Sequence, residues 1–111
     1  MNIVVLTGNL VATPTKKKVG DKDLAEFTLA VNEGDHASFF DCKAWNGWAK
    51  NLEATKGATL VVEGRLLQER WTDKPTGENR SKVVVVASSV REIAKKVAAP
   101  TREPETAQAT A

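Results

Sequence analysis

Three aromatic residues stand among charged residues in segments whose alternation is typical of β-strands. Phe39 and Trp45 lie in SFFDCKAW (residues 38–45), and Trp71 ends ATLVVEGRLLQERW (residues 58–71). Because successive side chains of a strand point to opposite faces, Phe39 and Trp45 share one face with an acid and a base. Large rings on a wet surface are costly unless something flat covers them. A nucleobase is flat, and stacking one on a ring contributes about 1–3 kcal/mol. The pattern therefore predicts base stacking on Phe39, Trp45 and Trp71.

Basic side chains accompany these rings on or beside the same strands. Lysine and arginine can follow a phosphate backbone and release its counterions. The residues that we expect to contact the backbone of single-stranded DNA are Lys43, Arg65, Arg70, Lys74 and Arg80. The formal net charge of the 111 residues is only +2, which is too low for binding by bulk electrostatics alone. Stacking must then supply a large part of the affinity.

Catalysis has no candidate cluster. His36 is the sole histidine and lies beside Asp35 in a predicted loop, where a solvated side chain is the better interpretation than a general base. Cys42 alternates with Phe40 and Ala44 on the core face of its strand, and a single cysteine excludes both an intrachain disulfide and a multi-cysteine zinc site. No glycine-rich phosphate loop is present. We expect no enzymatic activity, no cofactor and no metal.

Alternation and β-branched residues predict five strands. They cover residues 2–10, 24–32, 38–45, 58–71 and 82–88. Gly64 is expected to allow a bulge or sharp bend in the fourth of them. Polar turns are predicted for Pro14 to Asp23, which places Lys16, Lys17 and Lys18 near a tip, and for Thr72 to Arg80. Residues 89–97 could extend the sheet or form one or two helical turns.

A short helix is predicted between the third and fourth strands. Asn46 is a candidate N-cap and Gly57 is placed to end the helix. Trp48 and Leu52 are four residues apart on one side, which favours a core position for both. Strand, strand, strand, helix, strand, strand is the order of an OB-fold, a five-stranded Greek-key barrel. The predicted class is therefore all-β.

One domain accounts for residues 1–97. Residues 98–111 contain alanine, threonine, proline and glutamate without a large apolar side chain, and we expect them to be a disordered tail. No apolar run approaches the roughly 20 residues that a membrane helix needs. The N-terminus lacks the features of a secretory signal, and one cysteine suits a reducing compartment. We expect no membrane contact and a cytoplasmic location.

Four stretches together resemble the bacterial and phage single-stranded DNA-binding protein family. They are NIVVLTGNL, LAEFTLAVN, FFDCKAWNGWAKNLE and KGATLVVEGRLLQERWTD, and they cover most of residues 1–90. The resemblance implies an OB-fold homotetramer that binds single-stranded DNA with little sequence preference in replication, recombination and repair. It also implies that Phe39, Trp45 and Trp71 occupy the family's stacking positions. Phe40 occupies a position near the family's subunit interface.

Two departures from the family pattern bear on partners. The loop EGDHAS after the second strand lacks the aromatic that relatives often place there, so a smaller footprint on DNA is expected. The chain ends PETAQATA rather than in an acidic, hydrophobic tip, so recruitment of repair proteins through such a tip is not expected. An OB-fold module that docks another protein, as in a primosome-type complex, is the alternative function. An RNA-binding cold-shock-like domain ranks third.

Overall fold

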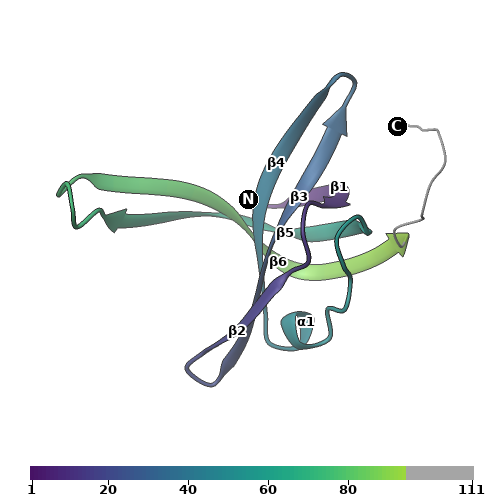
Figure 1. Ribbon diagram of the computed structural model, residues 1–111, viewed down its shortest axis with the longest axis horizontal. Helices are drawn as coiled ribbons and strands as arrows, with labels where there is room; N and C mark the ends of the chain where they lie inside the picture. The colour runs from purple at the N-terminus through teal and green to yellow at the C-terminus, as the bar shows by residue number, and fades with distance from the viewer. Residues whose placement is uncertain (95–111) are drawn as a thin grey trace.

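The computed structural model describes residues 1–94, which form six strands and one short helix (Figure 1). In chain order the elements are β1 (Val4–Leu10), β2 (Thr15–Val19), β3 (Lys22–Glu33), β4 (His36–Trp45), α1 (Gly47–Lys50), β5 (Thr59–Thr72) and β6 (Asn79–Ala94). The predicted all-β class and the position of the helix are confirmed. The bounds of the five predicted strands differ from the observed ones by three residues or fewer, except at the end of the last strand, where the difference is six.

The strand pairings form a ring. β1 pairs with β5, β5 with β6, β6 with β4 and β4 with β3, and β3 pairs again with the end of β1. All of these pairings are antiparallel except the short one between β4 and β6, where Cys42–Ala44 run parallel to Val85–Ala87. With α1 between β4 and β5, this is the arrangement of an OB-fold. The parallel pairing is the contact that joins the N-terminal hairpins to the C-terminal hairpin.

The prediction of a turn from Pro14 to Asp23 is wrong, because most of this segment forms an additional strand, β2, that continues the path of β1 along β3 after a break. β1 pairs with β3 up to Leu10↔Leu29, and β2 resumes the pairing at Thr15↔Glu26. Four residues of the first strand therefore face two residues of β3, and the chain bends there. The three consecutive lysines lie along β2 rather than at a tip, and the tight turn is confined to Gly20 and Asp21.

Two glycines allow backbones to approach each other closely. A Cβ on Gly8 would lie 2.6 Å from the carbonyl oxygen of Ala30, where β1 crosses β3. A Cβ on Gly64 would lie 2.0 Å from the carbonyl oxygen of Val86, where the register of β5 against β6 shifts. The predicted bulge at Gly64 is thus confirmed. Only a residue without a side chain fits these two positions.

The core consists of the inward-facing residues of the ring strands and of the segment after α1. Alternate residues of β3 and β4 contribute to it: Ala25, Phe27, Leu29, Cys42 and Ala44 are all buried, and the core positions of Cys42 and Ala44 are as predicted. Phe40 is half-buried and packs against this cluster. Ala49 and Leu52 attach α1 and the chain that follows it. The aliphatic residues of β5 and β6 complete the core: Leu60, Val62, Val85, Ala87 and Val90.

The helix departs from its prediction in three ways. It ends at Lys50 rather than near Gly57, and the Asn46 side chain makes no capping hydrogen bond. Asn46 has a φ of 57°, in the left-handed region that residues with a side chain seldom adopt. Trp48 is 45% exposed and does not belong to the core. A helix of four residues has only one buried position, and Ala49 occupies it.

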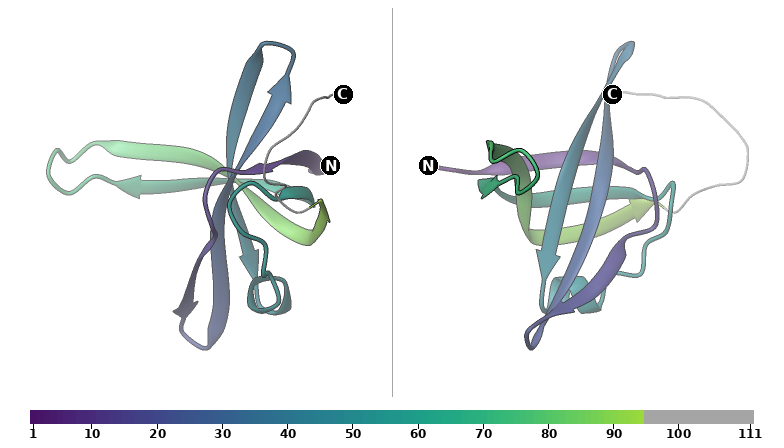
Figure 2. Two further views of the ribbon diagram at one scale, coloured as in Figure 1. Left: turned by 45° about the vertical axis from the view of Figure 1, so that its right-hand side comes forward. Right: turned by 60° about the vertical axis from the view of Figure 1, so that its left-hand side comes forward.

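Three hairpins project from the ring as arms (Figures 1 and 2). The β5–β6 hairpin extends to the left in Figure 1, the β3–β4 hairpin extends upward, and the β2–β3 hairpin extends downward beside α1. For residues 89–97 the sequence allowed either sheet or helix. Residues 89–94 continue β6, and residues 95–97 lie outside the described part. The predicted tail, residues 98–111, also lies outside it. Within residues 1–94, no helix has the length and apolar character needed to cross a membrane.

Gly64 provides a test of the bulge. Gly64→Ala places a methyl group against the main chain of β6, and we expect it to lower the free energy of unfolding by about 1–3 kcal/mol. Gly47→Ala is the matched control, because the nearest atom to its Cβ is 3.9 Å away and alanine suits a helix better than glycine. Urea denaturation compares the two variants. Equal midpoints for Gly64→Ala and the wild-type protein would contradict the bulge geometry.

Candidate nucleic-acid interface

One face of the sheet gathers most of the residues singled out from the sequence. Register places Phe39, Lys43 and Trp45 of β4 on this face, and it continues onto β6 and β5 because Lys43 is aligned with Val86 and Val86 with Arg65. Every second pair of the β5–β6 ladder points to the same side, and three such pairs beyond Arg65 the ladder reaches Trp71, which is paired with Arg80. We call this surface the aromatic face. Its members from β4, β5 and β6 are Phe39, Asp41, Lys43, Trp45, Arg65, Leu67, Glu69, Trp71, Arg80, Lys82, Val84 and Val86.

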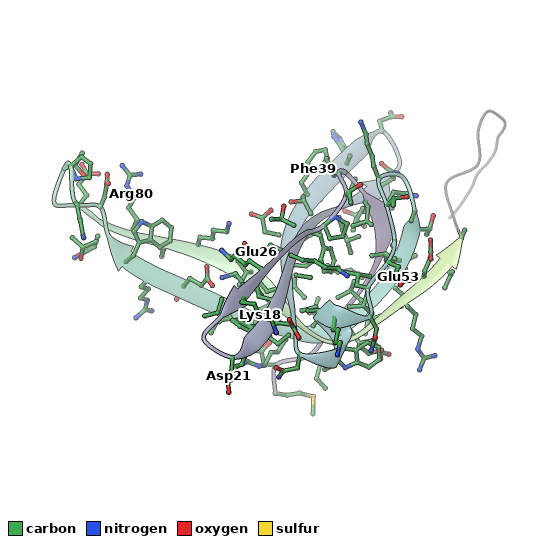
Figure 3. The ribbon with its side chains drawn as sticks, turned by 60° about the horizontal axis from the view of Figure 1, so that its bottom comes forward. Lys18, Asp21, Glu26, Phe39, Glu53 and Arg80 are labelled. Atoms are coloured by element: carbon green, nitrogen blue, oxygen red, sulfur yellow. The ribbon has the colours of Figure 1, made fainter. Side chains whose placement is uncertain are left out.

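Phe39 is the most exposed of the three predicted stacking rings. It lies on the β3–β4 arm with 64% of its surface accessible, and it is paired across the sheet with Ala30 (Figure 3). Alanine is too small to cover a phenyl ring, so the ring has an open side. The tip of the same arm carries Glu33 and Asp35, whose charges repel phosphate.

Trp45 lies at the opposite end of β4 and is half-buried. Its cross-strand partner is Leu24, which is buried although it points to the aromatic face. Leu24 is in turn aligned with Lys17 of β2. Trp45 therefore combines a packing role over Leu24 with a partly open ring, and a cation stands two strands away on β2.

Trp71 stands near the tip of the β5–β6 arm and is 46% exposed. It contributes to a hollow of about 470 Å³ whose other lining residues are Gln68, Arg70, Thr72, Asn79, Arg80 and Ser81. The turn that closes the arm is held by the amide of Asp73, which donates to the carbonyl of Glu78 at 2.7 Å. The Thr76 hydroxyl donates to the Asp73 carboxylate at 2.9 Å. Most of this lining alternates to the face opposite Trp71, so the hollow lies mainly behind the ring, and Trp71 itself remains partly open on the aromatic face.

Lys43 is surrounded by carboxylates, which the sequence pattern did not indicate. Its ammonium pairs with Glu69 of β5 and lies 3.9 Å from Glu26 of β3. Glu26 also pairs with Lys17 at 3.1 Å. Four strands contribute to this network, in which two lysines face two glutamates, so the centre of the aromatic face carries little net positive charge. Lys43 could bind a phosphate only by giving up part of this pairing.

Asp41 forms a second cross-strand contact. Its carboxylate accepts hydrogen bonds from the ammonium of Lys82 at 2.9 Å and from the hydroxyl of Thr28 at 2.8 Å. These two donors hold the pKa of Asp41 below its ordinary value of 3.8, with Lys82 as the larger cause. The same pair raises the pKa of Lys82 above 10.5. Lys82 comes from β6, so this contact crosses the short parallel pairing.

The other predicted phosphate contacts are distributed unevenly. Arg65 and Arg80 lie on the aromatic face, and Arg80 is shared with the carboxylates of Asp73 at 3.3 Å and Glu78 at 3.5 Å (Figure 3). Arg70 alternates to the opposite face, where its guanidinium donates to Gln68 at 2.9 Å. Lys74 is in the exposed turn of the arm. The face is therefore framed by cations at its edges rather than filled by them.

Cys42 and His36, the two residues weighed for catalysis in the sequence, have opposite environments: Cys42 is buried and His36 is exposed. Burial, with a smaller contribution from Asp41, raises the pKa of the Cys42 thiol to about 12, so this buried residue remains a neutral thiol near pH 7. His36 is exposed at the end of β4. Within residues 1–94, no three histidine, cysteine or carboxylate side chains are grouped so as to hold a metal ion.

Comparison with known proteins now identifies the family. A model of the single-strand binding protein family matches residues 1–93, which include every described strand except the last residue of β6. The chain belongs to this family. The resemblance inferred from its motifs is thereby confirmed.

Curated relatives of the family carry the name single-stranded DNA-binding protein. The one from Aquifex aeolicus is 33% identical over 103 residues, 82% of this chain and 69% of the relative. The one from Thermotoga maritima is 33% identical over 116 residues, 94% and 82% of the two chains. The one from Deinococcus radiodurans is 32% identical over 107 residues, 86% of this chain but only 35% of the relative. The chain thus spans two thirds or more of some relatives and about a third of another.

The contact of Asp41 with Lys82 can be tested by titration. Asp41 stabilises the fold while it is ionised, so its contribution is present above pH 3.8 and is lost as the pH falls through the lower pKa of the folded state. Lys82→Gln should move the pKa of Asp41 upward toward 3.8, and Thr28→Val should move it less. Carboxyl chemical shifts followed by NMR give the pKa. Lys74→Gln is the control and should leave the Asp41 titration unchanged.

Proposed function

We propose that this chain binds single-stranded DNA by placing bases against Phe39, Trp45 and Trp71, and that it acts without catalysis. The observation that carries the proposal is the presence of three partly or largely open rings on one face of an OB-fold sheet. OB-folds use such rings as platforms on which successive bases stack. Membership of the single-strand binding protein family and the printed names of the relatives support the same ligand.

Low sequence preference follows from the chemistry of the face. Every base offers a π-surface to a ring, whereas reading a sequence requires hydrogen bonds to base edges. The centre of the face is occupied by ion pairs that already satisfy Lys43, Asp41 and Lys82. A protein of this kind would protect and organise unpaired strands during replication, recombination and repair.

The charge distribution determines how binding responds to salt. Cations that frame the face release counterions when phosphates approach them, so affinity should fall as salt is added. Lys43 and Arg80 are already shared with carboxylates, which lowers their contribution. The salt dependence should therefore be weaker than for a strongly cationic protein of this size.

The alternative of an OB-fold module that docks another protein gains no support from the comparisons. The two functions can be separated by competition. If the aromatic face served a protein partner, single-stranded DNA would not displace that partner or quench the tryptophans.

Replacing the rings tests the stacking role. Phe39→Ala and Trp71→Ala should each weaken binding to oligo(dT) by about 1–3 kcal/mol, because each removes one platform. Trp45→Leu should act similarly while still covering Leu24. Fluorescence anisotropy of a labelled oligonucleotide at low salt gives the affinity, and circular dichroism verifies folding.

Val83→Ala on the opposite face of the β5–β6 arm is the matched control, since it removes an exposed apolar side chain that is not a ring. It should bind as the wild-type protein does. Unchanged affinity in all three ring variants would refute the proposed interface.

We further propose that the protein is a homo-oligomer, with four subunits as the expected number. Residues Val4–Gly8 of β1 pair only with β5 on one side, so the other edge of this segment remains open among the described residues. Ile3 and Val5 are exposed near this edge. On the paired side of β1 they contribute to a hollow of about 450 Å³ that also includes Glu63, Arg65 and Val86 of β5 and β6. An open edge bordered by apolar side chains favours pairing with a second copy.

Light scattering on the purified chain should report a mass of about four subunits. Val5→Lys should shift that mass downward, because a charge at this edge opposes strand pairing. Thr7→Lys places a charge on the same side of β1 and should lower the mass in the same way. A monomeric wild-type protein would contradict the oligomer and leave the stacking proposal in place.

A further inference from the structure

Trp48 is an exposed ring that the three proposed stacking positions do not include. It lies in the single turn of α1, is 45% exposed and is absent from the core cluster. Ala49 and Leu52 attach this part of the chain to the core. Because the anchoring is done by its neighbours, the indole of Trp48 is not required to hold α1 in place. Nearly half of a large apolar ring is left in water, which is costly without a ligand.

The backbone between Trp45 and Trp48 has an unusual conformation. Asn46 has a φ of 57° and is the only residue other than glycine with a positive φ in the described chain. Its amide donates to the carbonyl of Asp23 at 2.8 Å, which fixes the start of α1 to the β2–β3 hairpin. Three residues of extended chain span at most about 11 Å, so the backbones of the two tryptophans are close. Strain of this kind persists where the fold has to direct the chain along one particular path.

Two lysines, Lys16 on β2 and Lys50 at the end of α1, lie at this helix. The ammonium of Lys16 on β2 donates to the carbonyl of Lys50 at the end of α1, at 3.3 Å. Among residues 1–94, neither Lys16 nor Lys50 takes part in an ion pair within 4.0 Å, in contrast to Lys43 on the aromatic face. Lys50 lies two residues after Trp48 in α1 and Lys16 reaches the carbonyl at the end of the same helix, so two cations stand on or against the element that carries the exposed indole. A nucleotide offers a phosphate to such cations and a flat base to such a ring.

We propose that Trp48 is a fourth stacking platform, which takes a base of the same DNA strand that lies on Trp45, with Lys16 and Lys50 beside its phosphates. The strand then continues from the end of the aromatic face over α1 toward the β2–β3 hairpin. At the other end of β4, Glu33 and Asp35 at the tip of the β3–β4 arm repel phosphate. This inference rests on the proposed function and extends its site by one ring.

A protein with Trp48 as its only tryptophan tests the proposal directly. Trp45→Phe and Trp71→Phe keep aromatic rings at the other positions, so all emission comes from Trp48. Oligo(dT) is added while the anisotropy of a fluorescein label on the DNA reports binding. We expect Trp48 emission to fall in parallel with the rise in anisotropy, and acrylamide to quench it less in the complex. Bound DNA with unchanged emission and unchanged acrylamide access would overturn the proposal.

Affinity measurements on the otherwise wild-type protein provide a second test. Trp48→Ala should weaken binding on the order of tenfold, and Trp48→Phe should restore most of it. Val83→Ala, which shortens an exposed apolar side chain on the far face of the β5–β6 arm, is the matched control and should bind normally. Wild-type affinity for Trp48→Ala, with or without a change of mass in light scattering, would overturn the proposal. Failure of the wild-type protein to bind DNA would instead refute the proposed function.

Discussion

The short parallel pairing of β4 with β6 is the constraint on which the site depends. Only Cys42–Ala44 and Val85–Ala87 take part, yet they join two hairpins that are far apart in sequence. Because alternation continues across a paired ladder, this contact puts Phe39 and Trp45 on the same face as Trp71. Asp41 and Lys82 reinforce it from outside, and the buried thiol of Cys42 reinforces it from inside.

The aromatic face separates the two sources of affinity in space. Rings stand toward its ends, and its centre is occupied by the network of Lys43, Glu69 and Glu26. Fixed ion pairs at the centre leave few donors for base edges, so in the proposed interface shape and stacking would decide what binds. This accounts for a binding surface on a chain whose net charge is only +2.

Local patterns predicted the strands well, because period-two alternation depends only on neighbours in the sequence. The buried positions of Cys42 and Ala44 on β4 were predicted in this way, and so was the bulge at Gly64. The break between β1 and β2 and the exposure of Trp48 were not, because both depend on how distant segments cross. Helical spacing of Trp48 and Leu52 indicated a core position, but α1 is too short for that periodicity to apply. The partners of Lys43 were missed for the same reason, since Glu26 and Glu69 lie on other strands.

The β5–β6 arm has a thermodynamic consequence. Beyond the bulge, Leu66, Leu67, Val83 and Trp71 are all exposed, so the ribbon has water on both faces. An isolated two-stranded ribbon is marginally stable, and this one takes its order mainly from the ring at its base. Binding of a ligand along the arm therefore also costs conformational entropy, because the ligand has to order the ribbon. The affinity of such a complex would then understate the strength of its contacts, and stiffening the ribbon by itself would tighten it.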